Sequence, residues 1–194
     1  YNLTQEQLAR TLMPVGEYSK DRIREMADEI GLLVAHKPDS QDICFVPDGD
    51  YASFIENTTD QVLPTGNFVT PEGKVLGKHK GIIHYTVGQR KGLGLALGYP
   101  AFVLEIRPET NEVVIGTYEE SLTYTVRANE LNFMSVEQIT EPVRIFAKIR
   151  YNHKGAWCTV ERTGEDEIVC TFDEPIRAAT PGQAVVLYDG EYVL

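Results

Sequence analysis

The order of apolar and polar residues divides the chain into a helical beginning and a β-rich remainder. Near the start, Thr4 and Gln7 have the spacing of a capping box, ahead of apolar residues at helical intervals. A second helix is expected to begin at Ser19 and to end at Gly31, because glycine suits the left-handed residue that closes helices. Asp50 is expected to cap a third, short helix.

From Gly66 onward the pattern changes to short strands separated by turn residues. Two hairpins are predicted in the middle of the chain, one around Pro71–Gly73 and one around Pro108–Asn111. The segment 81–87 predicts a further strand, and the glycine-rich segment 88–98 predicts a loop in which backbone can approach another group closely.

The last third of the chain predicts several short strands of a small barrel or sandwich. Residues alternate well in the segment 143–151, so that successive side chains should point to opposite faces. One face is expected to carry Arg144, Phe146, Lys148 and Arg150, and the other Ile145, Ala147, Ile149 and Tyr151.

The charge of the chain leaves the kind of binding partner open. The net charge of −11 taken alone disfavours nucleic-acid binding. The stretch between Gly73 and Leu104, however, contains no acidic residue and carries Lys74, Lys78, Lys80, Arg90 and Lys91. This basic patch is either a phosphate-binding surface or an ordinary solvated surface, and charge alone does not decide between them.

The chain shows neither a membrane-spanning apolar run of about 20 residues nor a secretory signal, so a cytoplasmic location without membrane contact is expected. Its three cysteines lack the spacing of a disulfide framework or a zinc site, and no metal is expected. Cys158 and Cys170 share strand faces with apolar residues and should be core residues. Cys44 lies in a polar, turn-forming stretch, and its local context leaves a reactive and a structural role open.

The string Asp39-Ser40-Gln41-Asp42-Ile43-Cys44-Phe45 resembles a signature of tRNA-specific 2-thiouridylases. Further matches follow the same order along the chain. They are Met13–Gly16, Gly77–Gly81, His84–Gly94 and Thr180–Ala184. The resemblance runs over essentially the whole chain.

The resemblance implies an enzyme that replaces the 2-oxygen of the wobble uridine of tRNA with sulfur. ATP (with Mg) would adenylate the uridine, and a cysteine persulfide would supply the sulfur. By position, Cys44 would be the catalytic residue that holds the persulfide, and Arg150, Tyr151 and Gln183 would contact tRNA. Arg144 and Lys148 are possible phosphate contacts on the same strand face as Arg150. The implied partners are tRNA and a persulfide sulfur-donor protein.

The resemblance also implies the organisation of the chain. The fold class expected is α+β, with a helical tail of a nucleotide-binding domain at 1–50, a small central mixed domain at 51–122 and a C-terminal antiparallel β-barrel at 123–194. The family's ATP-binding loop would precede Tyr1, so the chain alone should bind no cofactor and be inactive. The alternative is a non-catalytic RNA- or protein-binding β-barrel module, which gives Cys44 no role.

Overall fold

The computed structural model describes residues 1–38, 46, 49–59 and 64–194. The chain forms two compact units, Thr4–Asp60 and a larger unit that combines Tyr1–Leu3 with Gln61–Leu194. Helices are few and most of the described residues with regular structure lie in strands, which confirms the α+β class.

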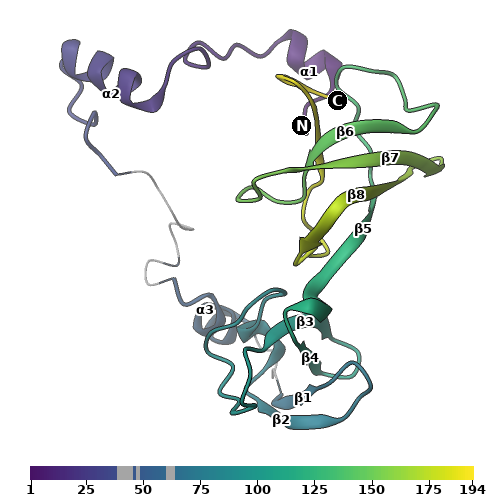
Figure 1. Ribbon diagram of the computed structural model, residues 1–194. Coiled ribbons are helices and arrows are strands. Elements are labelled where there is room, and N and C mark those ends of the chain that lie inside the picture. The colour runs from purple at the N-terminus through teal and green to yellow at the C-terminus, as the bar shows by residue number, and fades with distance from the viewer. Residues whose placement is uncertain (39–45, 47–48, 60–63) are drawn as a thin grey trace. The chain divides into compact units, whose positions relative to one another are not determined.

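The smaller unit contains three helices whose ends follow local sequence signals (Figure 1). They are α1 (Gln5–Ala9), α2 (Lys20–Glu29) and α3 (Tyr51–Thr58). The predicted caps are confirmed, because the Thr4, Ser19 and Asp50 side chains each accept a hydrogen bond from a backbone N–H in the first turn. Gly31 takes the left-handed conformation after α2. In the described part of the chain, no helix is long and apolar enough to span a bilayer.

The larger unit begins with a four-stranded sheet in the order β2-β1-β4-β3. Its strands are β1 (Gly66–Val69), β2 (Val75–His79), β3 (Phe102–Arg107) and β4 (Glu112–Gly116). Both predicted hairpins are confirmed, since β1 pairs with β2 and β3 with β4 in antiparallel fashion, whereas β1 and β4 are parallel. Phe68, Val103 and Ile115 are buried in the core of this sheet.

The strand predicted at 81–87 is wrong, because the chain there forms the short 3₁₀ helix η1 (Ile82–His84). The cause is a non-local contact of His79. Its Nδ1 accepts a hydrogen bond from the Gly81 N–H at 3.1 Å, and its Nε2 donates to the Asn111 carbonyl at 3.1 Å. This arrangement turns the chain immediately after β2 and leaves the His79 ring only 2% exposed.

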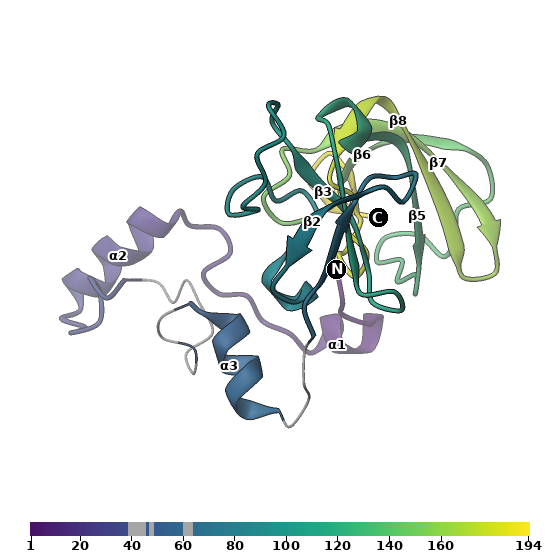
Figure 2. The ribbon, with the colours of Figure 1, turned by 90° about the horizontal axis from the view of Figure 1, so that it is seen from below.

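After the 3₁₀ helix η2 (Glu119–Ser121), the rest of the larger unit forms a six-stranded antiparallel sheet in the order β10-β9-β6-β7-β8-β5. Its strands are β5 (Leu122–Asn129), β6 (Val143–Lys148), β7 (Ala156–Gly164), β8 (Glu167–Arg177), β9 (Val186–Asp189) and β10 (Tyr192–Val193). Figures 1 and 2 both show β7 and β8 as neighbouring strands of this sheet. Among the described residues, the outer strands β5 and β10 do not pair with each other, so the sheet is open.

The alternation predicted along β6 is confirmed for the strand itself. Ile145 and Ala147 are buried with Ile149 just beyond the strand, while Arg144 is exposed and Lys148 half-buried. The placement of Tyr151 on the buried face is wrong, because 94% of its surface is exposed. The strand ends at Lys148, so period-two alternation no longer applies at Tyr151.

Candidate functional site

Cys44, the predicted persulfide carrier, lies outside the residues that the structure describes. The other two cysteines are core residues, as predicted: Cys158 and Cys170 are both 0% exposed, on the neighbouring strands β7 and β8. The hydrogen bond to Cys158, together with burial, raises the pKa of the Cys170 thiol. Because both thiols are fully buried, neither can be reached by the sulfur of another protein.

Arg150 lies just beyond β6 and is half-buried. Its Nη1 donates to the carbonyl oxygens of Arg177 and Ala178, at 3.0 and 2.9 Å. Both carbonyls lie where β8 ends, so one guanidinium nitrogen ties the end of β6 to the end of β8. Arg150 therefore has a structural role that its sequence position did not reveal.

Gln183 is connected to Arg150 through a shared hydrogen-bond acceptor, the carbonyl of Ala178. The Thr180 hydroxyl donates to the Ala178 carbonyl at 3.1 Å, and this is the same oxygen that Arg150 contacts. The Gln183 N–H then donates to the Thr180 carbonyl at 3.2 Å, which closes a turn. Arg150 and Gln183, predicted separately as tRNA contacts, are thus connected through the backbone of Ala178.

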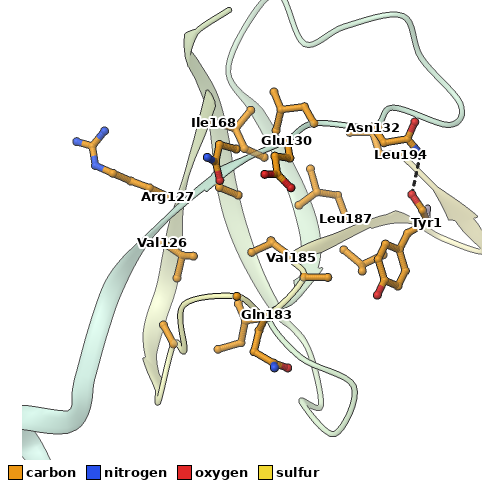
Figure 3. A pocket seen from close by; sticks show the side chains of 18 of the residues that line it. Tyr1, Val126, Arg127, Glu130, Asn132, Ile168, Gln183, Val185, Leu187 and Leu194 are labelled. Carbon is orange, nitrogen blue, oxygen red and sulfur yellow. Dashed lines mark hydrogen bonds between the residues drawn. The ribbon is translucent and has the colours of Figure 1, made fainter. Parts of the chain in front are cut away.

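A cavity of about 770 Å³ lies beside this turn on the inner side of the six-stranded sheet. Figure 3 shows the Gln183 side chain at one end of the cavity, near Val126 and Val185. The wall drawn there mixes apolar and polar side chains, and the Asn132 amide donates to the Tyr1 carbonyl at 2.7 Å. Among the described residues that line the cavity, Arg127 is the one arginine or lysine, and it is paired with Glu167 at 3.0 Å.

The end of β6 is electropositive. Burial lowers the pKa of His153, and the nearby charges of Arg150 and Lys148 lower it further. Arg150, Lys148 and the His153 ring therefore lie close together, and clustered cations attract phosphate. His153 was not predicted as a site residue; its position in the turn 152–155 beside two cations was the only sequence signal.

The remaining predicted site residues differ in how accessible their side chains are to a ligand. Tyr151 is almost fully exposed and can stack on a base or donate a hydrogen bond to a phosphate. Lys148 is half-buried at the positive end of β6. Arg144 is already engaged, because its Nη2 lies 2.6 Å from an Asp173 carboxylate oxygen and its guanidinium lies over the Trp157 ring at 4.7 Å. A phosphate contact by Arg144 would compete with Asp173.

The amino-acid sequence of the chain is similar to the sequences of known proteins. The chain is 61% identical over all of its 194 residues to the tRNA-specific 2-thiouridylase MnmA of Lachnoclostridium phytofermentans, of which it covers 54%. The chain belongs to the tRNA-specific 2-thiouridylase family. MnmA proteins of Clostridioides difficile and Acetivibrio thermocellus are 50% and 52% identical to the whole chain, which again covers 54% of each. The chain thus spans about half the length of the curated relatives it matches.

Three family models match consecutive parts of this chain. Residues 1–48 match the tRNA methyl transferase HUP domain, and residues 52–117 match the tRNA methyl transferase PRC-barrel domain. Residues 123–194 match the aminomethyltransferase beta-barrel domain. The last match begins one residue after the start of β5, so it coincides with the six-stranded sheet.

The glycine-rich segment 88–98 does not have the features of a phosphate-binding loop. It carries no Gly-Lys-Ser or Gly-Lys-Thr, and no described helix begins there. Leu93, Leu95 and Leu97 instead pack against the core of the four-stranded sheet. The segment is therefore a part of that sheet's packing, and no nucleotide-dependent step is assigned to it.

Proposed function

We propose that this chain is the central and C-terminal part of an enzyme that thiolates carbon 2 of the wobble uridine of tRNA. The observation that carries the proposal is the full-chain similarity to proteins named tRNA-specific 2-thiouridylase. The cationic end of β6 beside the Gln183 turn supports a role of this part in binding tRNA. The six-stranded sheet occupies the region 123–194 for which a barrel was expected, but among the described residues it is open and not closed into a barrel.

In the proposed reaction, Cys44 is the sulfur carrier. Its thiolate attacks the persulfide of a donor protein, takes the terminal sulfur and releases the donor thiolate. The terminal sulfur of the Cys44 persulfide then attacks carbon 2 of the adenylated uridine, and AMP leaves with the 2-oxygen. The thiolate of a second cysteine attacks the Cys44 sulfur, releases the 2-thiouridine and forms a disulfide with Cys44, which a reductant reopens. Cys158 and Cys170 are fully buried, so the second thiol is assigned to another part of the enzyme. Activation by ATP is likewise assigned outside this chain.

The carrier role is tested by mass spectrometry after incubation with a small persulfide donor. Trypsin places the three cysteines in different peptides, because Lys74, Lys154 and Arg162 separate them. The peptide with Cys44 should gain about 32 Da, the mass of one sulfur, in a form that a reductant removes. The peptides with Cys158 and Cys170 should not change. Equal gain on all three peptides, or none on Cys44, would refute the carrier assignment.

The assignment is also tested by thiolation of tRNA. In the complete enzyme, Cys44→Ser should abolish 2-thiouridine formation and leave tRNA affinity unchanged, since the hydroxyl cannot hold a sulfane sulfur. Cys170→Ala is the matched control, because it removes a thiol that the structure buries in the core. Thiolation by the Cys44→Ser enzyme would show that another residue carries the sulfur.

A further inference from the structure

Arg90 and Lys91 occupy a short turn that the protein holds in place at several points. The Gln89 side chain accepts a hydrogen bond from the Thr86 N–H at 3.0 Å and donates one to the Lys91 carbonyl at 2.9 Å. The backbone of Gln89 is fixed as well, because its carbonyl accepts from the Val103 N–H of β3 at 2.9 Å. Gln89 therefore links both sides of the turn and presents the two cations from a pre-organised backbone.

These two cations differ from three arginines of the larger unit. Arg107, Arg127 and Arg144 are each paired with a carboxylate. Arg90 and Lys91 are exposed and form no ion pair with any described residue. The chain between Gly73 and Leu104 also lacks acidic residues, so nothing nearby in sequence neutralises them. In a chain of net charge −11, this is an available positive site.

The surface next to Arg90 has groups that bind phosphate and sugar. A hollow of about 240 Å³ is lined by Arg90, by Tyr99 and by the backbone at Gly92 and Gly94. Tyr99 is 46% exposed, so its ring and hydroxyl can be reached from solvent. Guanidinium, ammonium, phenol and backbone N–H groups are the donors that nucleic-acid-binding proteins direct to phosphate and ribose.

The turn begins where the two sheets of the larger unit touch. A Cβ placed on Gly88 would lie 2.6 Å from the Cβ of Ala178, so the two residues are packed against each other. Arg150 donates to the carbonyl of that same Ala178. Nearby, the Arg177 guanidinium lies 5.4 Å from the centre of the Phe102 ring. The turn with Arg90 and Lys91 and the cationic end of β6 therefore flank one junction.

We propose that the Arg90–Lys91 turn is an RNA-backbone-binding element, which extends the tRNA contact surface of Arg150 and Tyr151 onto the four-stranded sheet. The inference rests on the proposed function, because it takes tRNA as the ligand. Beyond the proposed function, the inference states that Arg90 and Lys91 neutralise two phosphates and that Gln89 sets the geometry of this contact.

The test measures the affinity of the 194-residue chain for a fluorescent wobble-uridine tRNA transcript at several salt concentrations. Loss of two phosphate contacts in Arg90→Gln/Lys91→Gln should lower the salt slope of log K by about 1.5 and weaken binding about tenfold near 0.1 M salt. The matched control is Lys20→Gln/Lys37→Gln, which removes two exposed lysines of the smaller unit and should leave the slope nearly unchanged. Gln89→Ala should weaken binding about threefold with the slope preserved, because the charges remain while the turn loses its two side-chain hydrogen bonds.

Arg150→Gln, measured in parallel, separates failure of this inference from failure of the proposed function. If Arg150→Gln weakens binding and Arg90→Gln/Lys91→Gln does not, the turn makes no RNA contact and the inference is wrong by itself. If neither variant affects binding, the tRNA contacts assigned to this chain are wrong as well. Equal losses in Arg90→Gln/Lys91→Gln and in the lysine control would reduce the effect to net charge and overturn the specific site.

Discussion

The structural role of Arg150 and its proposed RNA-binding role can be measured separately. In Arg150→Gln the charge is lost and the shorter side chain cannot bridge the carbonyls of Arg177 and Ala178. Hydrogen bonds from a charged donor contribute about 1.5–3 kcal/mol each, and solvent screening at this half-buried site reduces that value. We therefore expect the free energy of unfolding to fall by about 2 kcal/mol in total.

Urea unfolding followed by the fluorescence of Trp157, the single tryptophan, measures the stability of this sheet. A loss of about 2 kcal/mol corresponds to a midpoint lower by about 1 M urea for a slope near 2 kcal/mol/M. Arg162→Gln is the matched control, because Arg162 also donates to backbone carbonyls, those of Gly164 and Glu165, at the other end of β7. Both variants should be destabilised to a similar extent.

Binding of tRNA should distinguish these two arginines. The salt slope of log K should decrease by about 0.7–0.9 in Arg150→Gln, as expected for one lost phosphate contact. It should stay unchanged in Arg162→Gln. Arg150→Lys should keep the slope while losing stability, because an ammonium retains the charge without the planar fork of donors. If Arg150→Gln and Arg162→Gln have the same salt slope, Arg150 is a structural residue only.

Two further predictions concern the four-stranded sheet and its junction. Burial lowers the pKa of His79 below the value near 6.5 of an unfolded histidine, so the unfolded state binds more protons and stability should fall as pH drops below about 6.5. His79→Leu should weaken this pH dependence, and the contribution of His153 should remain. At pH 8 the substitution should lower the free energy of unfolding by about 2–4 kcal/mol, because two buried backbone groups lose their hydrogen-bond partner. An unchanged difference in urea midpoint between pH 5.5 and 8 would contradict this prediction. Gly88→Ala should lower the free energy of unfolding by about 1–3 kcal/mol more than Gly98→Ala does. Both glycines have a left-handed backbone conformation, but of the two only Gly88 would bring its new Cβ against the Ala178 side chain. Equal thermal midpoints of the two alanine variants would show that the junction accommodates the added methyl group without loss of stability.

The elements predicted well from the sequence are those whose cause is local. Thr4, Ser19 and Asp50 cap their helices because each side chain reaches a backbone N–H three residues away. The hairpin around Pro108–Asn111 forms for the same kind of reason, with Asn111 in the left-handed conformation that asparagine tolerates. Cys158 and Cys170 were placed in the core because period-two alternation is a property of the strand itself.

The predictions that failed or were incomplete depend on contacts between distant residues. The segment 81–87 has the composition of a strand, but the His79 ring bridges Gly81 and Asn111 and directs the chain into η1. The structural role of Arg150 follows from the carbonyls of Arg177 and Ala178, which are 27 and 28 residues away and carry no side-chain signal. Local pattern alone could not identify either feature.

Ala178 explains why residues predicted separately come together. It is one of three described non-glycine residues with positive φ, and alanine, unlike asparagine, has no side-chain group that compensates for this conformation. The surroundings hold it there, with two donors on its carbonyl and Gly88 making room for its Cβ. Because the Arg150, Thr180 and Gly88 contacts all meet at this residue, a change in its backbone would move the end of β6, the Gln183 turn and the start of the Arg90–Lys91 turn together. The junction between the sheets, more than either sheet alone, therefore sets the spacing of the proposed RNA contacts.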